Sequence, residues 1–210
     1  MPPRSDSRQR MVRTTASLLR RQGFAATSWR QVVAESATPW GSQAHHFPGG
    51  KEQLAREAIA ESGAAYKLLL QGALAATHPA DAVRFWVETA ARQLEGSAWA
   101  DGCPVATVAL ETAHISDQLA DACQRAFTSW TDALTRSFEG SGYTGDDAAS
   151  LATLVLAAME GAQLLARAGR DSAPLRSVGR ELEKLLRSRI DGATGTTVVI
   201  PHPGGEGTVT

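Results

Sequence analysis

The chain has 210 residues, 43% of them hydrophobic, and a formal net charge of −1. This composition excludes a disordered chain, because it supplies enough apolar surface for a core. The longest apolar runs, such as 151–159, are shorter than the roughly 20 residues that a membrane span needs, so we expect no membrane partner. The opening MPPRSDSRQR lacks the apolar stretch of a secretory signal, and only Cys103 and Cys123 are present, so we expect a cytoplasmic protein with reduced thiols.

The net charge conceals an uneven distribution along the chain. Residues 1–51 hold eight basic and two acidic side chains, a formal charge of +6, whereas the remainder holds 13 basic and 20 acidic ones, a charge of −7. A basic head on an acidic body indicates an anionic partner for the head alone. A chance excess of solvated arginines is the alternative.

Apolar residues recur at helical spacing along most of the chain, and almost no stretch alternates as a strand does. The predicted fold class is therefore all-α. Gly23 is expected to end the first helix, because a helix commonly stops at a glycine with left-handed backbone. Helices are predicted at about 5–22, 28–36, 39–46, 51–76, 79–98, 104–113, 116–140, 145–168 and 174–191.

The first three helices are short, and a three-residue turn separates the second from the third, which is a helix-turn-helix pattern. In that arrangement the third helix enters the major groove of DNA and the second crosses the backbone. Thr27 or Ser28 is predicted to cap the second helix, where hydroxyl and N–H groups also meet phosphates. Thr38 is predicted to cap the third helix, with Pro39 as its first residue. The pattern alone is not specific, because any small helical bundle has short helices and turns.

Two motifs carry a resemblance to a known family. The stretch GFAATSWRQVVAESATPWGSQAHHFPGGKEQL at 23–54 resembles the signature of TetR-family transcriptional regulators, with a short recognition helix that ends in His-Phe and a Lys-Glu that opens the fourth helix. Its Phe-Pro-Gly-Gly-Lys-Glu-Gln-Leu segment, and GCPVATVALE at 102–111, resemble the branch of multidrug and lincomycin-resistance regulators. The resemblance implies a homodimeric repressor that binds operator DNA, needs no cofactor and is released by a small apolar or aromatic effector.

The resemblance also implies the domain organisation. We expect an N-terminal three-helix helix-turn-helix domain over 1–50 and a larger C-terminal helical ligand-binding and dimerisation domain over 51–192. The segment 193–210 is rich in Gly, Thr and Pro, which predicts a flexible tail. Within it, residues 196–200 can form a strand if another segment pairs with them.

Most residues of the head that can contact DNA have a structural alternative. Arg30 is either a solvated helix residue or a DNA contact, and Trp40 either packs or meets thymine methyls and sugars. Lys51 resembles the phosphate-binding lysine of the family, with a freely solvated lysine as the alternative. Adjacent histidines on a helix point about 100° apart and suit a shared metal poorly, so no metal is predicted. The predicted DNA-binding residues are Thr27, Ser28, Arg30, Trp40, Gly41, Ser42, Gln43, His45, His46 and Lys51.

The head departs from the family pattern in two places, the recognition helix and the turn before it. Gln43 and Ala44 stand where the family usually has Leu and Tyr, and Ala37 stands where Gly is usual. The tyrosine normally contacts phosphate and the leucine normally packs inside. The change at Gln43 and Ala44 motivates an alternative function: a helical ligand-binding dimer that has lost sequence-specific DNA binding.

The body supplies candidates for a ligand pocket and for a dimer face. Aromatic and thioether side chains near the Gly-Cys-Pro break suit a flat apolar ligand, although each one singly also suits an ordinary core. Glu111 and Glu160 lie on apolar stretches, where a carboxylate either pairs with a cationic ligand or is exposed or bonded locally. The predicted ligand-binding residues are Phe85, Trp86, Trp99, Cys103, Glu111, His114, Phe127, Trp130, Met159 and Gln163.

The last two long helices carry apolar stripes that predict a four-helix dimer interface, with an intramolecular core as the alternative. The predicted interface residues are Leu154, Ala158, Leu175, Val178, Leu182 and Leu185.

The sequence lacks three common catalytic motifs. It has no Gly-rich phosphate loop, no GxSxG elbow and no HExxH. His114 with Cys103 or Cys123 is the nearest approach to a catalytic pair, and no third group completes it. We therefore predict that the protein is not an enzyme.

Overall fold

The computed structural model describes residues 4–194, and within this range it contains nine helices and no strand. The predicted all-α fold class is confirmed. The predicted tail lies outside the described residues except for 193–194, which belong to the last helix. The helices are α1 (Arg4–Ala26), α2 (Trp29–Glu35), α3 (Ser42–His46), α4 (Gly50–Ala76), α5 (Pro79–Gly96), α6 (Pro104–Thr112), α7 (Asp117–Gly140), α8 (Gly145–Gly169) and α9 (Ala173–Thr194).

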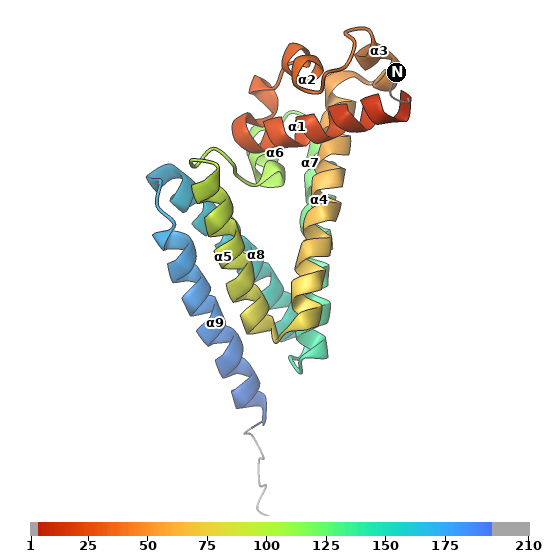
Figure 1. Ribbon diagram of the computed structural model, residues 1–210. Helices are drawn as coiled ribbons and strands as arrows, with labels where there is room; N and C mark the ends of the chain where they lie inside the picture. Colours follow the sequence, from red (N-terminus) through yellow and green to blue (C-terminus); the bar gives the residue numbers. More distant parts are fainter. Residues whose placement is uncertain (1–3, 195–210) are drawn as a thin grey trace, which may run out of the picture.

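Helices α1–α3 form a head at one end of the molecule, and the longer helices extend away from it (Figure 1). Helix α4 leaves the head and packs along α7, while α5 packs along α9. Helix α8 lies against both α7 and α9. Helix α1 packs on α4 and equally on α6, so the head rests on the body through two separate helices.

A single cluster of buried apolar residues runs from the head into the body. In the head it contains Met11 and Leu19 of α1 and Phe47, which follows α3, each at most 2% exposed. The Phe47 ring lies 6.2 Å from the ring of Trp29 and 5.2 Å from the Arg8 guanidinium. Phe47 therefore anchors the end of the recognition helix to α1 and α2.

The sequence predicts that the first helix ends at Gly23, whereas in the structure Gly23 kinks α1, which continues to Ala26. The φ of 80° at Gly23 lies in the left-handed region, where glycine is favoured. A Cβ at this position would also overlap the Glu111 carboxylate. That carboxylate accepts a hydrogen bond of 2.8 Å from the backbone N–H of Ala25. The bend in α1 is thus held from the body by α6.

The third helix is shorter than predicted, because it begins at Ser42 and not near Pro39. The buried Thr38 hydroxyl pairs with the Ser36 hydroxyl at 2.8 Å, so it does not cap α3. The Ser42 N–H instead bonds the Pro39 carbonyl at 3.0 Å, and residues 39–41 form a turn. Trp40 therefore lies in the turn before the recognition helix.

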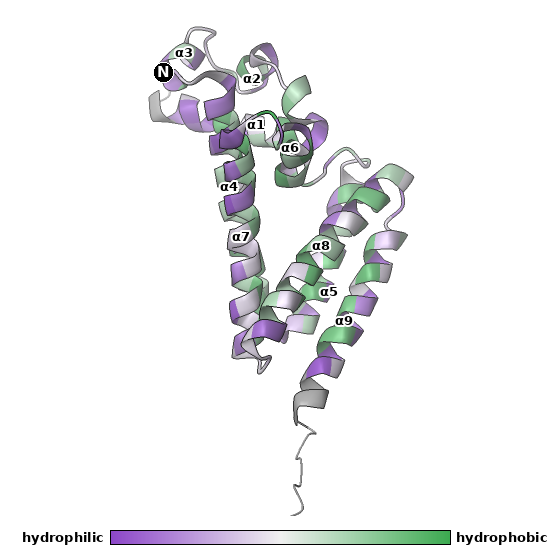
Figure 2. Cartoon of the chain, turned by 180° about the vertical axis from the view of Figure 1, so that it is seen from behind, coloured by the Kyte–Doolittle hydropathy of each residue, from purple (hydrophilic) through white to green (hydrophobic). Residues whose placement is uncertain are grey.

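Helix α8 is the one described helix that is long and apolar enough to cross a membrane by length and composition alone. One of its sides is buried within the body, through Leu151, Val155 and Met159. Figure 2 shows that α5 and α9 alternate hydrophobic and hydrophilic residues, as amphipathic helices do. Because one side of α8 is buried against its neighbours, this helix belongs to the packed body.

Candidate functional site

Thr27 and Ser28, two neighbouring hydroxyl residues before α2, have different structural roles. The Ser28 hydroxyl accepts the Gln31 N–H at 3.2 Å, and the Gln31 side chain accepts the Ser28 N–H, which completes a capping box. Thr27 is 1% exposed, and its hydroxyl donates to the Gly23 carbonyl at 2.6 Å. Thr27 is therefore a buried packing residue, which corrects its prediction as a DNA contact.

The other predicted DNA contacts of α2, α3 and the turn between them reach the surface to different extents. Arg30, Trp40, Gly41 and His45 are exposed, with Trp40 at 60%. The remaining three residues are partly buried: Ser42, Gln43 and His46. The Ser42 hydroxyl donates to the Pro39 carbonyl.

Lys51 is held by the head rather than freely solvated. Its Nζ lies 4.3 Å from the Phe24 ring centroid and 3.4 Å from the Ala25 carbonyl oxygen. Desolvation lowers the pKa of Lys51, and the nearby Glu111 carboxylate opposes this by raising it. The ammonium group, which lies at the start of α4, therefore holds this helix against the end of α1.

Several head arginines are already paired. Arg8 binds Glu57 at 2.6 Å, and Arg10 binds Asp6 at 2.5 Å. Arg30 is exposed, and no ion pair among residues 4–194 involves it. Much of the positive charge counted in the sequence is thus compensated, and Arg30 remains available to an anionic partner.

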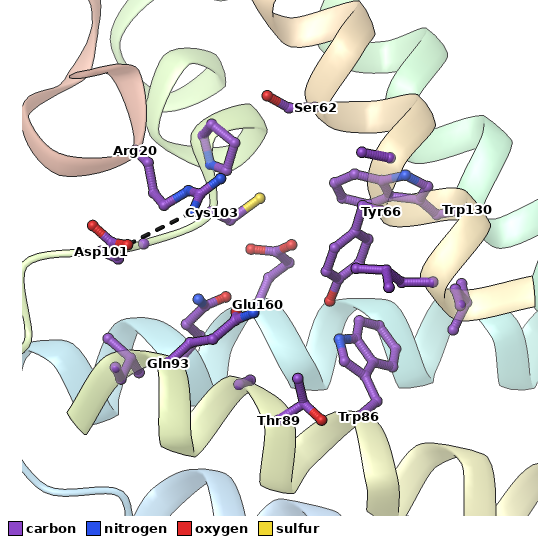
Figure 3. Close-up of a pocket in the computed structure, with 18 of the residues that line it drawn as sticks. Arg20, Ser62, Tyr66, Trp86, Thr89, Gln93, Asp101, Cys103, Trp130 and Glu160 are labelled. Carbon is purple, nitrogen blue, oxygen red and sulfur yellow. Dashed lines mark ion pairs between the residues drawn. The ribbon is translucent and has the colours of Figure 1, made fainter. Parts of the chain in front are cut away.

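A cavity of about 270 Å³ lies in the body next to the head. Its walls come from α1, α4, α5, α7, α8 and the segment before α6. Figure 3 shows the rings of Tyr66, Trp86 and Trp130 along one side. The Tyr66 ring lies 4.6 Å from that of Trp130 and 5.6 Å from that of Trp86. These rings from α4, α5 and α7 form a continuous aromatic wall.

Glu160 of α8 brings a carboxylate into this cavity (Figure 3). Burial raises its pKa to about 7, and a hydrogen bond from the Cys103 thiol lowers it in part. Burial also raises the pKa of Cys103 well above its ordinary value, and the carboxylate adds to that rise. Because the thiol stays protonated, Cys103 is not poised as a nucleophile. Burial and the same carboxylate raise the pKa of Tyr66.

A second cavity of about 310 Å³ adjoins the first, between α6, α7 and α8. The two cavities share Gly102, Cys103, Glu160 and Gln163, so the Cys103–Glu160 pair separates them. Leu110 and Leu164 line the second cavity and are also among the most exposed apolar residues.

The structure brings together six of the ten predicted ligand-binding residues. Phe85, Trp86, Cys103, Trp130 and Gln163 line the first cavity, and Phe127 lines the second together with Cys103 and Gln163. That they bind a ligand stays a prediction. Tyr66 and Arg20 also line the first cavity but were not predicted, because Tyr66 lies alone on α4 and Arg20 lies in the head. A ligand contact by Glu160 was predicted only as an alternative.

The other four predicted ligand-binding residues do not line either cavity. Glu111 bonds the α1 bend, and His114 is exposed beyond the end of α6. Met159 is 3% exposed within the core, on the side of α8 that carries Leu151 and Val155. Trp99 packs against the core from the turn after α5. Tertiary packing therefore places these four residues outside the lining of both cavities.

The predicted dimer residues divide between two surfaces. Leu154 of α8 is 46% exposed and Ala158 is partly exposed. Leu175 and Leu182 of α9 are at most 5% exposed inside the protomer, so their assignment to an interface is corrected to the intramolecular core. The remaining two, Val178 and Leu185, are partly buried against the same core.

Comparisons with known proteins agree with one another. Residues 79–181 match the family described as "Transcriptional regulator LmrA/YxaF-like, C-terminal domain". The chain is 33% identical to YxaF of Bacillus subtilis, an uncharacterized HTH-type transcriptional regulator, over 90% of this chain and 100% of that protein. It is 31% identical to the HTH-type transcriptional regulator LmrA of Bacillus subtilis, over 87% of this chain and 97% of LmrA.

Solved structures share the fold. The reduced form of NemR from Escherichia coli superposes with a TM-score of 0.77 at 20% identity, over 85% of this chain and 96% of NemR. A TetR-family regulator from Cytophaga hutchinsonii also gives 0.77, at 23% identity, over 90% of this chain and 98% of its own. The chain therefore belongs to the TetR family of DNA-binding transcriptional regulators, which are not enzymes, in the group with an LmrA/YxaF-like C-terminal domain.

Proposed function

We propose that this chain is a ligand-responsive repressor that acts as a homodimer in the cytoplasm and leaves its operator DNA when an effector fills the central cavity. Residues 1–50 form the DNA-binding domain in this proposal, and 51–192 form the ligand-binding and dimerisation domain. One observation carries the proposal: the wall of the cavity includes Arg20, a residue of the first helix of the head. A molecule in the cavity can thus act on the DNA-binding head by contact.

The exposed residues of α2, α3 and the turn between them form the proposed DNA surface. Arg30 and His45 supply donors for phosphates or base edges, and Trp40 supplies an exposed ring for sugars and thymine methyls. In a dimer, two such surfaces would have to lie roughly 34–36 Å apart to enter successive major grooves.

The dimer is proposed to form through the exposed side of α8. Leu154 and Leu165 lie eleven positions apart, which is three helical turns, and are 46% and 62% exposed. Ala158 and Gly161 lie between them on the same side, where small residues allow two helices to approach closely. Exposed leucines in line with small residues are typical of a helix that packs on a second copy.

Two physical links can transmit the effect of a ligand. Helix α4 begins in the head at Gly50 and carries Tyr66 into the cavity wall. In addition, the Gly102 N–H donates to the Arg20 carbonyl at 3.1 Å, which ties the cavity rim to α1. A coupling of about 1–3 kcal/mol through these links would change DNA affinity about 5- to 150-fold.

The test is binding of the purified protein to DNA from beside its own gene, measured by fluorescence anisotropy across a salt series. Arg30→Ala is compared with Arg136→Ala, which removes the same charge from an exposed site on α7. We expect tight, salt-steep binding that Arg30→Ala weakens and Arg136→Ala leaves unchanged. Binding no tighter than to unrelated DNA would favour the alternative, a helical ligand-binding dimer without sequence-specific DNA recognition.

A further inference from the structure

We infer that the effector of this cavity is an organic cation with a flat aromatic body, and that Glu160 is its charge anchor. The inference rests on the proposed function, because it names the chemical class of the molecule proposed to fill the cavity.

The carboxylate of Glu160 has no counter-charge within residues 4–194. No ion pair among the described residues involves it, and its hydrogen bond comes from the neutral thiol of Cys103. An ionised carboxylate that is withdrawn from water without a cation is unfavourable, and a bound cation would remove that cost.

The basic groups nearest the cavities are already engaged. Arg20 lies 3.6 Å from the Asp101 carboxylate, and both side chains line the first cavity (Figure 3). Arg167, which lines the second cavity, donates to the Arg21 carbonyl at 2.7 Å. Of the charged side chains that line the first cavity, Arg20 and Asp101 pair with each other, whereas Glu160 has no ion pair among the described residues. Its negative charge favours cations and disfavours anions.

The aromatic wall supplies the second half of the recognition. Tyr66, Trp86 and Trp130 border the same cavity as the carboxylate, and the faces of such rings attract cations as well as flat apolar surfaces. A flat aromatic cation can thus stack on this wall while its charge lies near the carboxylate. A neutral flat molecule would stack on the aromatic wall but would leave the negative charge of Glu160 without a counter-charge.

One further polar atom points to a ligand. The Nε1 of Trp86 is buried and has no hydrogen-bond partner among the described residues. A buried donor in a cavity wall without an acceptor is costly, and a ligand oxygen or nitrogen would satisfy it. The cation is therefore expected to gain affinity from a hydrogen-bond acceptor on its ring system.

The pKa of about 7 for Glu160 agrees with this assignment. The groups around it are Cys103, Tyr66 and the Arg20–Asp101 pair in the first cavity, and Arg167 in the second. Cys103 and Tyr66 have raised pKa values and stay neutral near pH 7. Binding of a permanent cation would therefore follow the ionisation of Glu160 and strengthen about tenfold between about pH 6 and about pH 8.

The test uses three probes of similar shape: N-methylquinolinium as the cation, methylnaphthalene as the neutral molecule and naphthoate as the anion. Their binding to the full-length protein without DNA is followed by calorimetry and by quenching of tryptophan fluorescence. We expect the cation to bind most tightly. Glu160→Gln should weaken its binding about thirtyfold or more and abolish the pH dependence. Glu139→Gln, the same change at an exposed site on α7, should leave both unchanged.

Two results would overturn the inference: equal or tighter binding of methylnaphthalene or naphthoate than of the cation, or cation binding that Glu160→Gln does not weaken. The DNA-release assay is read separately. Cation binding that depends on Glu160 but does not release DNA would uphold the ligand class and reject ligand-responsive repression. Release of DNA by the neutral probe alone would uphold ligand response and reject the cation.

Discussion

The Arg20 guanidinium lies 3.6 Å from the Asp101 carboxylate, and both side chains line the central cavity. Arg20 belongs to the first helix of the head, whereas Asp101 belongs to the segment of the body before α6. Arg21 reaches the same carboxylate at 3.2 Å. The end of α1 is thus fastened to the cavity rim, so displacement of this rim by a ligand would move the head without acting through α4.

Asp101→Asn should loosen this joint and change the global stability little. The ion pairs are partly exposed, so their loss should lower the free energy of unfolding in urea by at most about 1 kcal/mol. Hydrogen exchange of the amides at 21–28 should nevertheless become faster, which mass spectrometry can measure. Asp132→Asn, at an exposed site on α7, is the control. Unchanged exchange at 21–28 would show that Asp101 does not hold the head.

Two substitutions at Ser28 should separate capping from phosphate contact. Ser28→Ala removes the cap of α2 and should lower the free energy of unfolding by about 1 kcal/mol, whereas Ser28→Asp keeps a capping oxygen and should preserve it. If Ser28 faces phosphate, Ser28→Asp should bind DNA more weakly than Ser28→Ala, because it adds a negative charge. Thermal unfolding and anisotropy measure the two effects. Equal DNA affinity of the two variants would remove Ser28 from the DNA surface.

The stability of the protein should depend on pH through Glu160. Burial raises the pKa of its carboxyl from 4.5 to about 7, so the folded state holds a proton that the unfolded state has lost between these values. Stability therefore falls as pH rises through this window, by up to about 3 kcal/mol for this group. Glu160→Gln is neutral at every pH and should lack this decline.

The comparison is made by urea unfolding of the wild type and the Glu160→Gln variant at several pH values. The advantage of the variant should grow from about pH 4.5 to about pH 7 and then level off. Glu139→Gln should follow the wild type throughout. A constant difference between the wild type and Glu160→Gln across the range would mean that the Glu160 carboxyl titrates near its ordinary pKa.

Gly179 should tolerate no larger residue while Val87 remains. A Cβ at Gly179 of α9 would lie 2.7 Å from the Cγ2 of Val87 on α5, closer than side-chain contacts allow. Gly179→Ala should therefore lower the free energy of unfolding by about 1–3 kcal/mol. Adding Val87→Ala should cost less in this variant than in the wild type, because it relieves the clash. Additive losses in a double-mutant cycle would show that α9 shifts freely instead.

We expect dimer formation to depend on Leu154 and Leu165. Replacing both with Glu places two charges on the exposed side of α8 and should convert a dimer into monomers, which light scattering after gel filtration can detect. Leu68→Glu on α4, where the leucine is 69% exposed, is the control and should leave the dimer intact. Retention of the dimer in the double variant would place the interface elsewhere.

The sequence by itself determined the elements that depend on neighbouring residues. Helical periodicity marked each long helix, and the break in helical backbone at Gly23 and the cap at Ser28 followed from local backbone and hydrogen-bond chemistry. The motif at 23–54 was sufficient to indicate the family. The start of α3 was predicted wrongly, because the buried Thr38 hydroxyl pairs with the Ser36 hydroxyl and does not cap the helix.

Only the tertiary structure decided which side of each helix faces a cavity, the core or solvent. Leu175 and Leu182 belong to an apolar stripe that suits an interface or a core equally well, and packing against α5 and α8 makes it a core. Tyr66 and Glu160 lie almost a hundred residues apart and meet because α4 and α8 border the same cavity. Periodicity identifies an apolar face, but the partner of that face depends on contacts between distant segments.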